Sequence, residues 1–385
     1  MDLTSRLLRL GAGRPHVLLV EAPGGIEARL AVEREARTRG WPAAGSPADA
    51  DLVVVAGRVT DDLAAQADRL WRQAPRPRVH LTAPEAPSTG RLLDEATARL
   101  AAGGDLSDDA PASTPHESRS SHRPPEPPGD HGGHGGHGDV GMDMPGGVPM
   151  ADRGEDRDGL MLDQLHVPLG PLLPDWPAGL VVHTTLQGDV IQDARVEVVG
   201  CAAPSFWNEP WRRVASGDPV TVGAASRRRV AGHLDSLARL LTVAGWADAA
   251  ARSRHLRDDL LTGATTAELG PRLWRLARRV RRSRTLRWLT NDIGAVPAGA
   301  SPLRARGDVT ARWSGWLAAA EQLLPDLDRS DRLPLGDAPR DPPAELVAML
   351  PRLLTGTELA TARLVVASLD PDLAELGTSA EIPGG

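Results

Sequence analysis

The hydrophobic pattern of this 385-residue chain stops near Gly103 and resumes at Leu160. Between these points Pro, Gly, Ser, His and Asp prevail, and such a composition cannot bury enough apolar surface to hold a fold. The totals of 40 Gly and 34 Pro also favour an unstructured part. The break therefore predicts two folded domains, 1–102 and 159–385, joined by a disordered linker rich in His, Gly, Met and Pro over 103–158.

In the first half, short apolar runs alternate with helical stretches. His16–Ala22, Asp51–Gly57 and Arg78–Ala83 have the composition of buried strands, and Ile26–Arg39 has that of a helix. Alternation of this kind specifies a parallel sheet with helices on its faces. We therefore expect a flavodoxin-like α/β domain at the N-terminus.

The second half has a different pattern. Two alternating runs flank the turn Gln187-Gly188-Asp189 and predict a β-hairpin over 180–199. The rest has helical periodicity, which predicts an α+β, mostly helical domain. The expected helices are Ser226–Leu241, Trp246–Leu261, Thr265–Leu289, Asp308–Leu324, Ala344–Leu354 and Glu358–Ser368.

Charge is unevenly distributed along a chain whose net charge is −7. The region 205–317 carries 20 Arg against 9 acidic residues, and Arg272–Arg287 alone contains eight Arg. This segment could lie on anionic lipid, or its guanidinium groups could pair with acidic residues of this chain or of a partner. With no Lys and no Tyr, the segment gives no reason to expect specific nucleic-acid binding.

A single cysteine, Cys201, restricts the chemistry of the chain. It excludes an intramolecular disulfide and any iron–sulfur or zinc site that needs several thiolates from this chain. The start of the sequence, MDLTSRLLRLGAG, lacks the apolar region of a signal peptide, and no run approaches the length of a membrane span. We expect a cytoplasmic protein.

The region 103–158 contains one candidate metal site. Imidazoles and thioethers on a flexible glycine chain can converge on Ni(II), Cu(II) or Zn(II), although ordering such a chain offsets much of the binding energy. The candidate ligands are His131, His134, His137, Met142 and Met144. The alternative is a solvated linker without a bound metal.

The first half resembles the small, cluster-bearing subunit of complex I and of nickel–iron hydrogenases. The strand ending in Ala56-Gly57, with Val59-Thr60 after it, matches that family's "A-G-x-V-T". Upstream, Pro23, Gly24 and Gly25 stand where the family reads "C-C-A" at its iron–sulfur cluster. The resemblance therefore implies a cluster loop that has lost its ligands, and we expect no iron–sulfur cluster.

The second half resembles the large partner subunit of the same complexes, the 49-kDa type. Gly170–Pro174, Gly188-Asp189-Val190, Gly307–Arg312 and Ala362–Asp370 follow the order of that family's motifs. Leu173 and Pro174 occupy the loop where the family carries a quinone-binding His, and the family's quinone-site Tyr has no counterpart in a chain without Tyr. The resemblance implies a degenerate quinone loop.

Together the two resemblances imply a fused, degenerate pair of subunits with no catalytic residues of its own. We expect a structural or assembly subunit of a complex-I-like (NADH-quinone oxidoreductase or energy-converting hydrogenase-like) assembly, peripheral on the inner face of the cell membrane. Its expected partners are membrane-embedded antiporter-like subunits, and no cofactor is expected. Two alternatives stay open: an electron-transfer or quinone-reacting component that uses cofactors of other chains, and a metal-delivery factor acting through the His/Met-rich segment.

Overall fold

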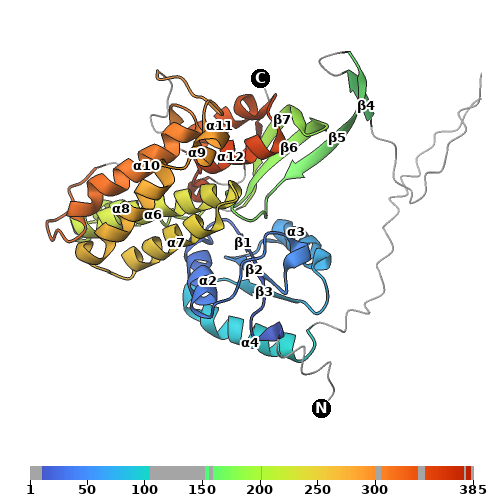
Figure 1. Cartoon of the computed structure of the whole chain (residues 1–385). Helices are drawn as coiled ribbons and strands as arrows, with labels where there is room; N and C mark the ends of the chain where they lie inside the picture. The colour runs from blue at the N-terminus through green and yellow to red at the C-terminus, as the bar shows by residue number, and fades with distance from the viewer. Residues whose placement is uncertain are drawn as a thin grey trace, which may run out of the picture.

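The computed structural model describes residues 11–104, 152–155, 159–200, 202–299, 305–336, 343–376 and 379–382. Figure 1 shows an N-terminal α/β part below a larger part that consists of an antiparallel sheet and a group of helices. Most of the predicted disordered linker, including its candidate metal ligands, lies outside the described residues, as does Cys201.

The N-terminal part is built on a three-stranded parallel sheet, which confirms the α/β prediction. Its strands are β1 (Val17–Glu21), β2 (Leu52–Ala56) and β3 (Val79–Ala83), in that order. Alternate residues along the strands pack into separate hydrophobic clusters, as expected for a sheet that is buried on both faces. The helices are α2 (Ile26–Thr38), α3 (Asp61–Gln73) and α4 (Thr89–Ala101); α2 and α4 share one cluster and α3 contributes to the other two.

The antiparallel sheet is larger than the sequence predicts. The hairpin is present as β6 (Leu180–Gln187) and β7 (Val190–Val198), but β4 (Asp152–Glu155), β5 (Met161–Leu169) and β8 (Ser379–Ile382) extend the sheet in the order β4-β5-β6-β7-β8. Most of β5 is exposed, so it lacks the alternation that marks a half-buried strand. Strand β4 lies inside the stretch 103–158 that the sequence predicts as linker.

The predicted helices are present, with one correction. The single long helix predicted over Thr265–Leu289 is wrong: the chain breaks at Ser283, whose hydroxyl accepts a hydrogen bond from the Leu286 amide (3.1 Å) and begins a new helix. The helices are α5 (Glu209–Ala215), α6 (Val222–Val243), α7 (Ala247–Leu261), α8 (Thr266–Arg281), α9 (Arg284–Thr290), α10 (Val309–Leu323), α11 (Pro343–Leu354) and α12 (Leu359–Leu369).

The main hydrophobic core surrounds α6, which packs against α7, α10 and α12. Trp313 of α10 is fully buried there, and its indole N–H donates to the Thr290 hydroxyl (3.1 Å). Ile26 and Leu30 of α2 belong to the same cluster. One core therefore extends from the second half of the chain into the first, so the two halves form a continuous apolar interface.

Candidate functional site between the two halves

The loop between β1 and α2 lies at the carboxyl end of the parallel strands, where α/β sheets place their sites. The Gly25 amide donates to the Ala22 carbonyl (2.8 Å), which closes a tight turn. A Cβ at Gly25 would lie 2.2 Å from the Ala56 carbonyl oxygen, and Gly57 approaches the same turn. Only glycine at position 25 lets the loop contact the end of β2 so closely.

Gly25→Ala is therefore expected to destabilise the protein by about 1–3 kcal/mol, because the added methyl group forces the backbone to move away from Ala56. Thermal or denaturant unfolding measures the effect. Gly45→Ala is the matched control, since a Cβ there meets nothing within 4 Å. Equal stability of the two variants would contradict the close contact between Gly25 and the Ala56 carbonyl.

The neighbouring loop residues contact the second half of the chain. The Pro23 ring lies so close to the backbone of Gly179 and Gly200 that a Cβ at those positions would be 2.9 and 2.5 Å from it. A Cβ at Gly24 would be 2.9 Å from that of Ala203. Pro23 and Gly24, which the resemblance aligns with the cluster cysteines, thus pack directly against the second half of the chain.

Beside this loop, a buried set of ion pairs connects the halves. Arg29 of α2 donates from Nε to Glu21 (2.6 Å) and from Nη2 to Asp235 of α6 (2.7 Å). Arg239, one turn further along α6, donates to Glu21 (3.0 Å) and to Asp370 (3.3 Å). All of these side chains are at least nine-tenths buried.

The ion pairs continue along α2 and α7. Arg257, which is fully buried, contacts Asp235 (2.6 Å), Glu33 (2.7 Å) and Asp258 (2.7 Å). Arg254 contacts Asp175 (2.8 Å), and Arg37 pairs with Asp258. We call the whole set the interface ion network; its members are Glu21, Arg29, Glu33, Arg37, Asp175, Asp235, Arg239, Arg254, Arg257, Asp258 and Asp370.

The pKa values of the carboxylates in the network are shifted in different directions. Burial acts to raise the pKa of Asp235, but the charges of Arg29, Arg257 and Arg239 outweigh it and lower that pKa. The same competition, with Arg257 as the strongest opposing charge, holds the pKa of Glu33 at about 2. Glu21 is different: burial, with the nearby Asp235 carboxylate, raises its pKa despite its two Arg partners. Burial also raises the pKa of Asp175, so Glu21 and Asp175 are the carboxylates of the network that favour a proton more than they would in water.

The depressed pKa of Glu33 predicts a loss of stability in acid. Because the folded state binds fewer protons than the unfolded state, the contribution is complete above the ordinary pKa of 4.5 and is lost as the pH falls towards about 2. Melting temperatures over this pH interval measure it. Glu33→Gln is expected to flatten the acid limb, and an unchanged slope in that variant would contradict the assignment.

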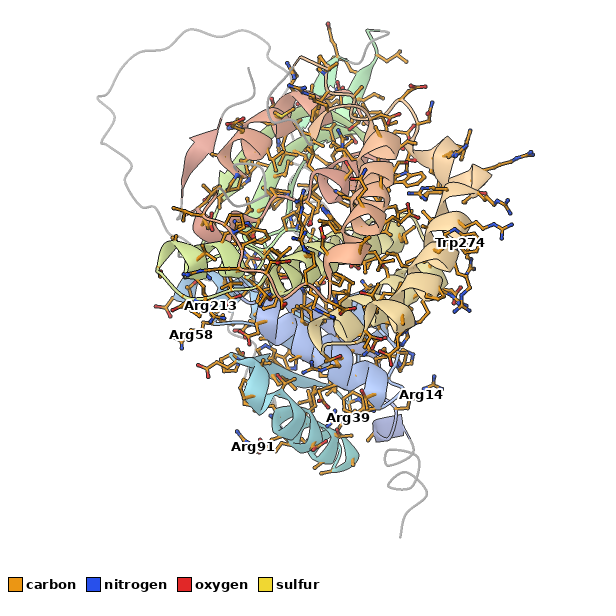
Figure 2. All side chains as sticks on the ribbon, turned by 90° about the vertical axis from the view of Figure 1, so that its left-hand side faces the viewer. Arg14, Arg39, Arg58, Arg91, Arg213 and Trp274 are labelled. Carbon is orange, nitrogen blue, oxygen red and sulfur yellow. The ribbon has the colours of Figure 1, made fainter. Side chains whose placement is uncertain are left out.

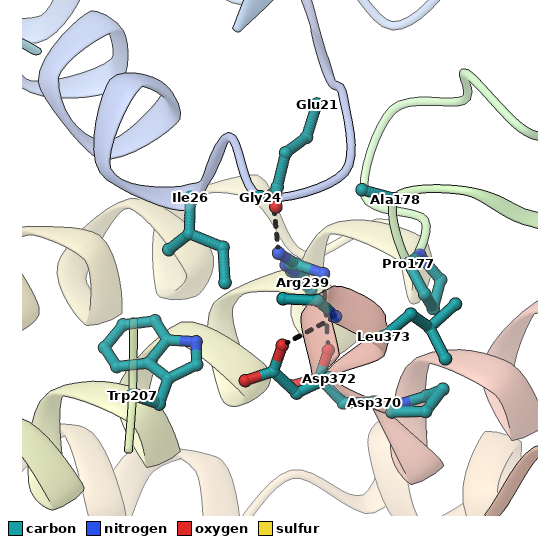
Figure 3. Close-up of a pocket in the computed structure, with 12 residues that line it drawn as sticks. Glu21, Gly24, Ile26, Pro177, Ala178, Trp207, Arg239, Asp370, Asp372 and Leu373 are labelled. Carbon is teal, nitrogen blue, oxygen red and sulfur yellow. Dashed lines mark hydrogen bonds and ion pairs between the residues drawn. The ribbon is translucent and has the colours of Figure 1, made fainter. Parts of the chain in front are cut away.

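A small pocket opens between the halves beside the network (Figure 3). It holds about 360 Å³ of empty space, part of it open to solvent. Figure 3 shows Arg239 between Glu21 and Asp370, with Trp207 at the left of the view and Leu373 at the right. None of the described residues that line it is a Ser, Thr, Cys or His; the lining residues are Glu21, Gly24, Ile26, Pro177, Ala178, Trp207, Arg239, Asp370, Pro371, Asp372, Leu373 and Ala374. The charged groups that line the pocket are three carboxylates and one guanidinium group.

The structure brings some of the predicted site residues to this pocket and leaves others outside it. Gly24 lines the pocket, whereas Pro23 and Gly25 do not. Leu173 packs against the main core, and Pro174 does not line the pocket, although Pro177 in the same loop does. The loop positions from the resemblance are therefore near the pocket without forming its charged wall.

Sequence reasoning missed Glu21 and Arg239, which line the pocket, and their network neighbours Arg29 and Asp235. Two signals were available: Glu21 ends an apolar strand, and Arg29 interrupts the apolar stretch of α2. Asp370 ends the motif that resembles the large-subunit terminus, and it caps α12 with a left-handed backbone (φ +39°).

The motif Gly307–Arg312 has a structural function. Asp308 caps α10 by accepting from the Ala311 amide (2.7 Å). The guanidinium group of Arg312 donates to the carbonyls of Gly294, Ala305 and Gly307 (2.7–2.9 Å) and to Ser368 (2.9 Å). With the side chain buried, desolvation lowers the pKa of Arg312 to about 10. Arg312 thus connects the loops before α10 to α12.

Metal ligands are the remaining candidates. Within the described residues, no group of three or more His, Cys, Asp or Glu side chains is arranged to hold a metal ion. The prediction for His131, His134, His137, Met142 and Met144 concerns residues outside that part of the chain. It stays a prediction.

Comparisons with known proteins give one structural similarity to report. No family model and no curated protein sequence matches the chain. Among solved structures, the chain is similar to a chain of the membrane-bound sulfane sulfur reductase, an archaeal respiratory membrane complex. The match covers 55% of this chain and 98% of that one, with 14% sequence identity and a TM-score of 0.36.

Proposed function

We propose that this protein is a non-catalytic structural or assembly subunit of a complex-I-like, membrane-associated respiratory complex. Its halves would correspond to a flavodoxin-like small subunit and a 49-kDa-type large subunit in one chain. The observation that carries the proposal is the interface between the halves: at the loop that the resemblance aligns with a cluster site, Pro23 and Gly24 pack directly on the second half, and buried ion pairs surround them.

Retained scaffold motifs support the same proposal. Gly25 is required by the turn it makes, and Asp308 and Arg312 fix the start of α10. These residues preserve the framework of the resembled subunits, whereas the positions aligned with cluster and quinone ligands hold Pro23, Gly24 and Leu173, which cannot ligate a metal through their side chains. A chain selected for its fold, and not for cofactor binding, would keep the structural residues and lose the ligands in this way.

The proposed location is the inner face of the cell membrane, on the cytoplasmic side. Among the helices that the structure describes, none has the length and apolarity that a membrane crossing requires. The partners would be membrane-embedded antiporter-like subunits, with anionic lipid near Arg272–Arg287. Strand β5 exposes Met161, Leu162 and Leu165, with Leu160 directly before it, which is a surface that a subunit of a larger assembly could bury.

Affinity isolation from membranes tests the proposal. We expect the tagged chain to bring multi-span membrane subunits with it, and the purified chain to contain no stoichiometric iron and to lack visible absorbance. Several irons per chain would favour the electron-transfer alternative. Recovery of metal-maturation proteins instead of membrane subunits would favour metal delivery through the His/Met-rich segment.

A further inference from the structure

The surface of α8 and α9 combines exposed tryptophan with arginine that has no acidic partner among the described residues. Trp274 and Trp288 are 56% and 80% exposed, although burial of such large apolar rings is the usual state. Figure 2 shows Trp274 on the outer side of the helical half, away from the N-terminal part. Single exposed residues need no explanation, but two Trp within 15 residues, interleaved with Arg, form a distinct surface.

Many of the arginines on this surface are not neutralised by the part of the protein that the structure describes. Arg272, Arg279 and Arg281 have carboxylate partners. The other five Arg of the segment form no ion pair with any described residue; they are Arg275, Arg278, Arg282, Arg284 and Arg287. In a protein with a net charge of −7, this concentration of free positive charge points to an anionic partner.

Helix geometry places three of these groups on one face. Trp274 and Arg278 of α8 and Arg282, its C-cap, follow one another at a spacing of four residues, so they share one face. The opposite face carries the buried Leu269, Leu273, Leu276, Ala277 and Val280. Arg278 lies over the Trp274 ring at 5.2 Å, which keeps both the indole and the guanidinium group at the surface.

We propose that the exposed Trp and Arg side chains of α8, α9 and the turn between them bind the surface of an anionic phospholipid bilayer. We call this surface the Arg/Trp face; its residues are Trp274, Arg275, Arg278, Arg282, Arg284, Arg287 and Trp288. The guanidinium groups would contact the lipid phosphates, and the two indoles would sit at the level of the headgroups, the position that Trp prefers in membrane interfaces. Single-stranded nucleic acid is a poorer match, because it would require aromatic rings positioned for stacking along a basic groove. The inference rests on the proposed peripheral location and names the contact that holds the chain there.

Vesicle co-sedimentation of the purified full chain tests this inference without any partner subunit. We expect binding to phosphatidylglycerol-containing vesicles, weak binding to pure phosphatidylcholine vesicles, and a decrease with added salt. Since each basic residue near an anionic surface contributes about 1 kcal/mol, the triple variant Arg282→Gln, Arg284→Gln, Arg287→Gln should bind about 100-fold more weakly. The pair Trp274→Ala and Trp288→Ala should also weaken binding, at unchanged net charge.

A matched control removes the same charge elsewhere. Arg58, Arg72 and Arg91 are exposed on the N-terminal part and form only surface ion pairs, so replacing all three with Gln should leave vesicle binding within about twofold. An equal loss in this control, or equal binding to neutral vesicles, would overturn the inference. If vesicles do not bind while membrane subunits still co-purify, the Arg/Trp face contacts protein, and the proposed function stands without the lipid contact.

Discussion

Asp235→Asn is expected to destabilise the protein by about 3–5 kcal/mol, the usual cost of removing one partner from a buried ion pair. Asp235 is 2% exposed and accepts from Arg29 and Arg257, while Arg239 lies within 3.6 Å. The substitution keeps the shape of the side chain but leaves excess positive charge between the two halves. Equilibrium unfolding in denaturant measures the change, and the transition should shift for both halves together.

Asp248→Asn is the control for this prediction. Asp248 also pairs with two arginines, Arg252 and Arg279, but its side chain is 56% exposed. Water and salt can replace the lost interactions there, so the stability should hardly change. If the two variants lose equal stability, the interface ion network is more hydrated than the structure shows.

Trp313→Ala is expected to cost about 3–5 kcal/mol, as is typical when a large aromatic side chain is removed from a core. The Trp313 side chain is fully buried between α10 and the rest of the main core. Its loss creates a cavity and also leaves the Thr290 hydroxyl without its indole donor. Thermal unfolding monitored by circular dichroism reports the loss.

Trp288→Ala tests whether the loss of stability depends on the burial of the tryptophan and not on the residue type alone. At 80% exposure, Trp288 contributes little to the core, so its replacement should leave the melting temperature nearly unchanged. The same variant should weaken vesicle binding, which separates its function from folding. A Trp313→Ala variant as stable as Trp288→Ala would contradict the packing of α10.

The sequence predicts most of the fold because the elements have clear periodicity. The buried runs around β1 to β3 and the long apolar stripes of α6 and α10 are local signals. Strand β5 could not be predicted in this way, because its exposed residues do not alternate. The break between α8 and α9 depends on one hydroxyl, that of Ser283, inside an otherwise continuous helical pattern.

The candidate site could be predicted only in part. The resemblance marks the loop at Gly24 and Gly25, and the structure places Gly24 at the pocket. The apolar residues around Glu21 and Arg29 indicate that these two charges are buried, but they do not identify the partners. The pairing has no local signature, since Arg29 and Asp235 are 206 residues apart and Glu21 and Arg239 are 218 apart. Only the tertiary contact between the halves makes them buried partners.

The shared core and the interface ion network also bear on how the protein must be produced. Made separately, the first half would expose Ile26 and Leu30 and leave Arg29 without Asp235, and the second half would leave Arg239 without Glu21. Encoding both halves in one chain supplies them in a strict one-to-one ratio. Neither half then accumulates alone with an exposed apolar and charged interface that would promote aggregation. A substitution on one side of the interface can also be compensated by a second substitution in the same gene.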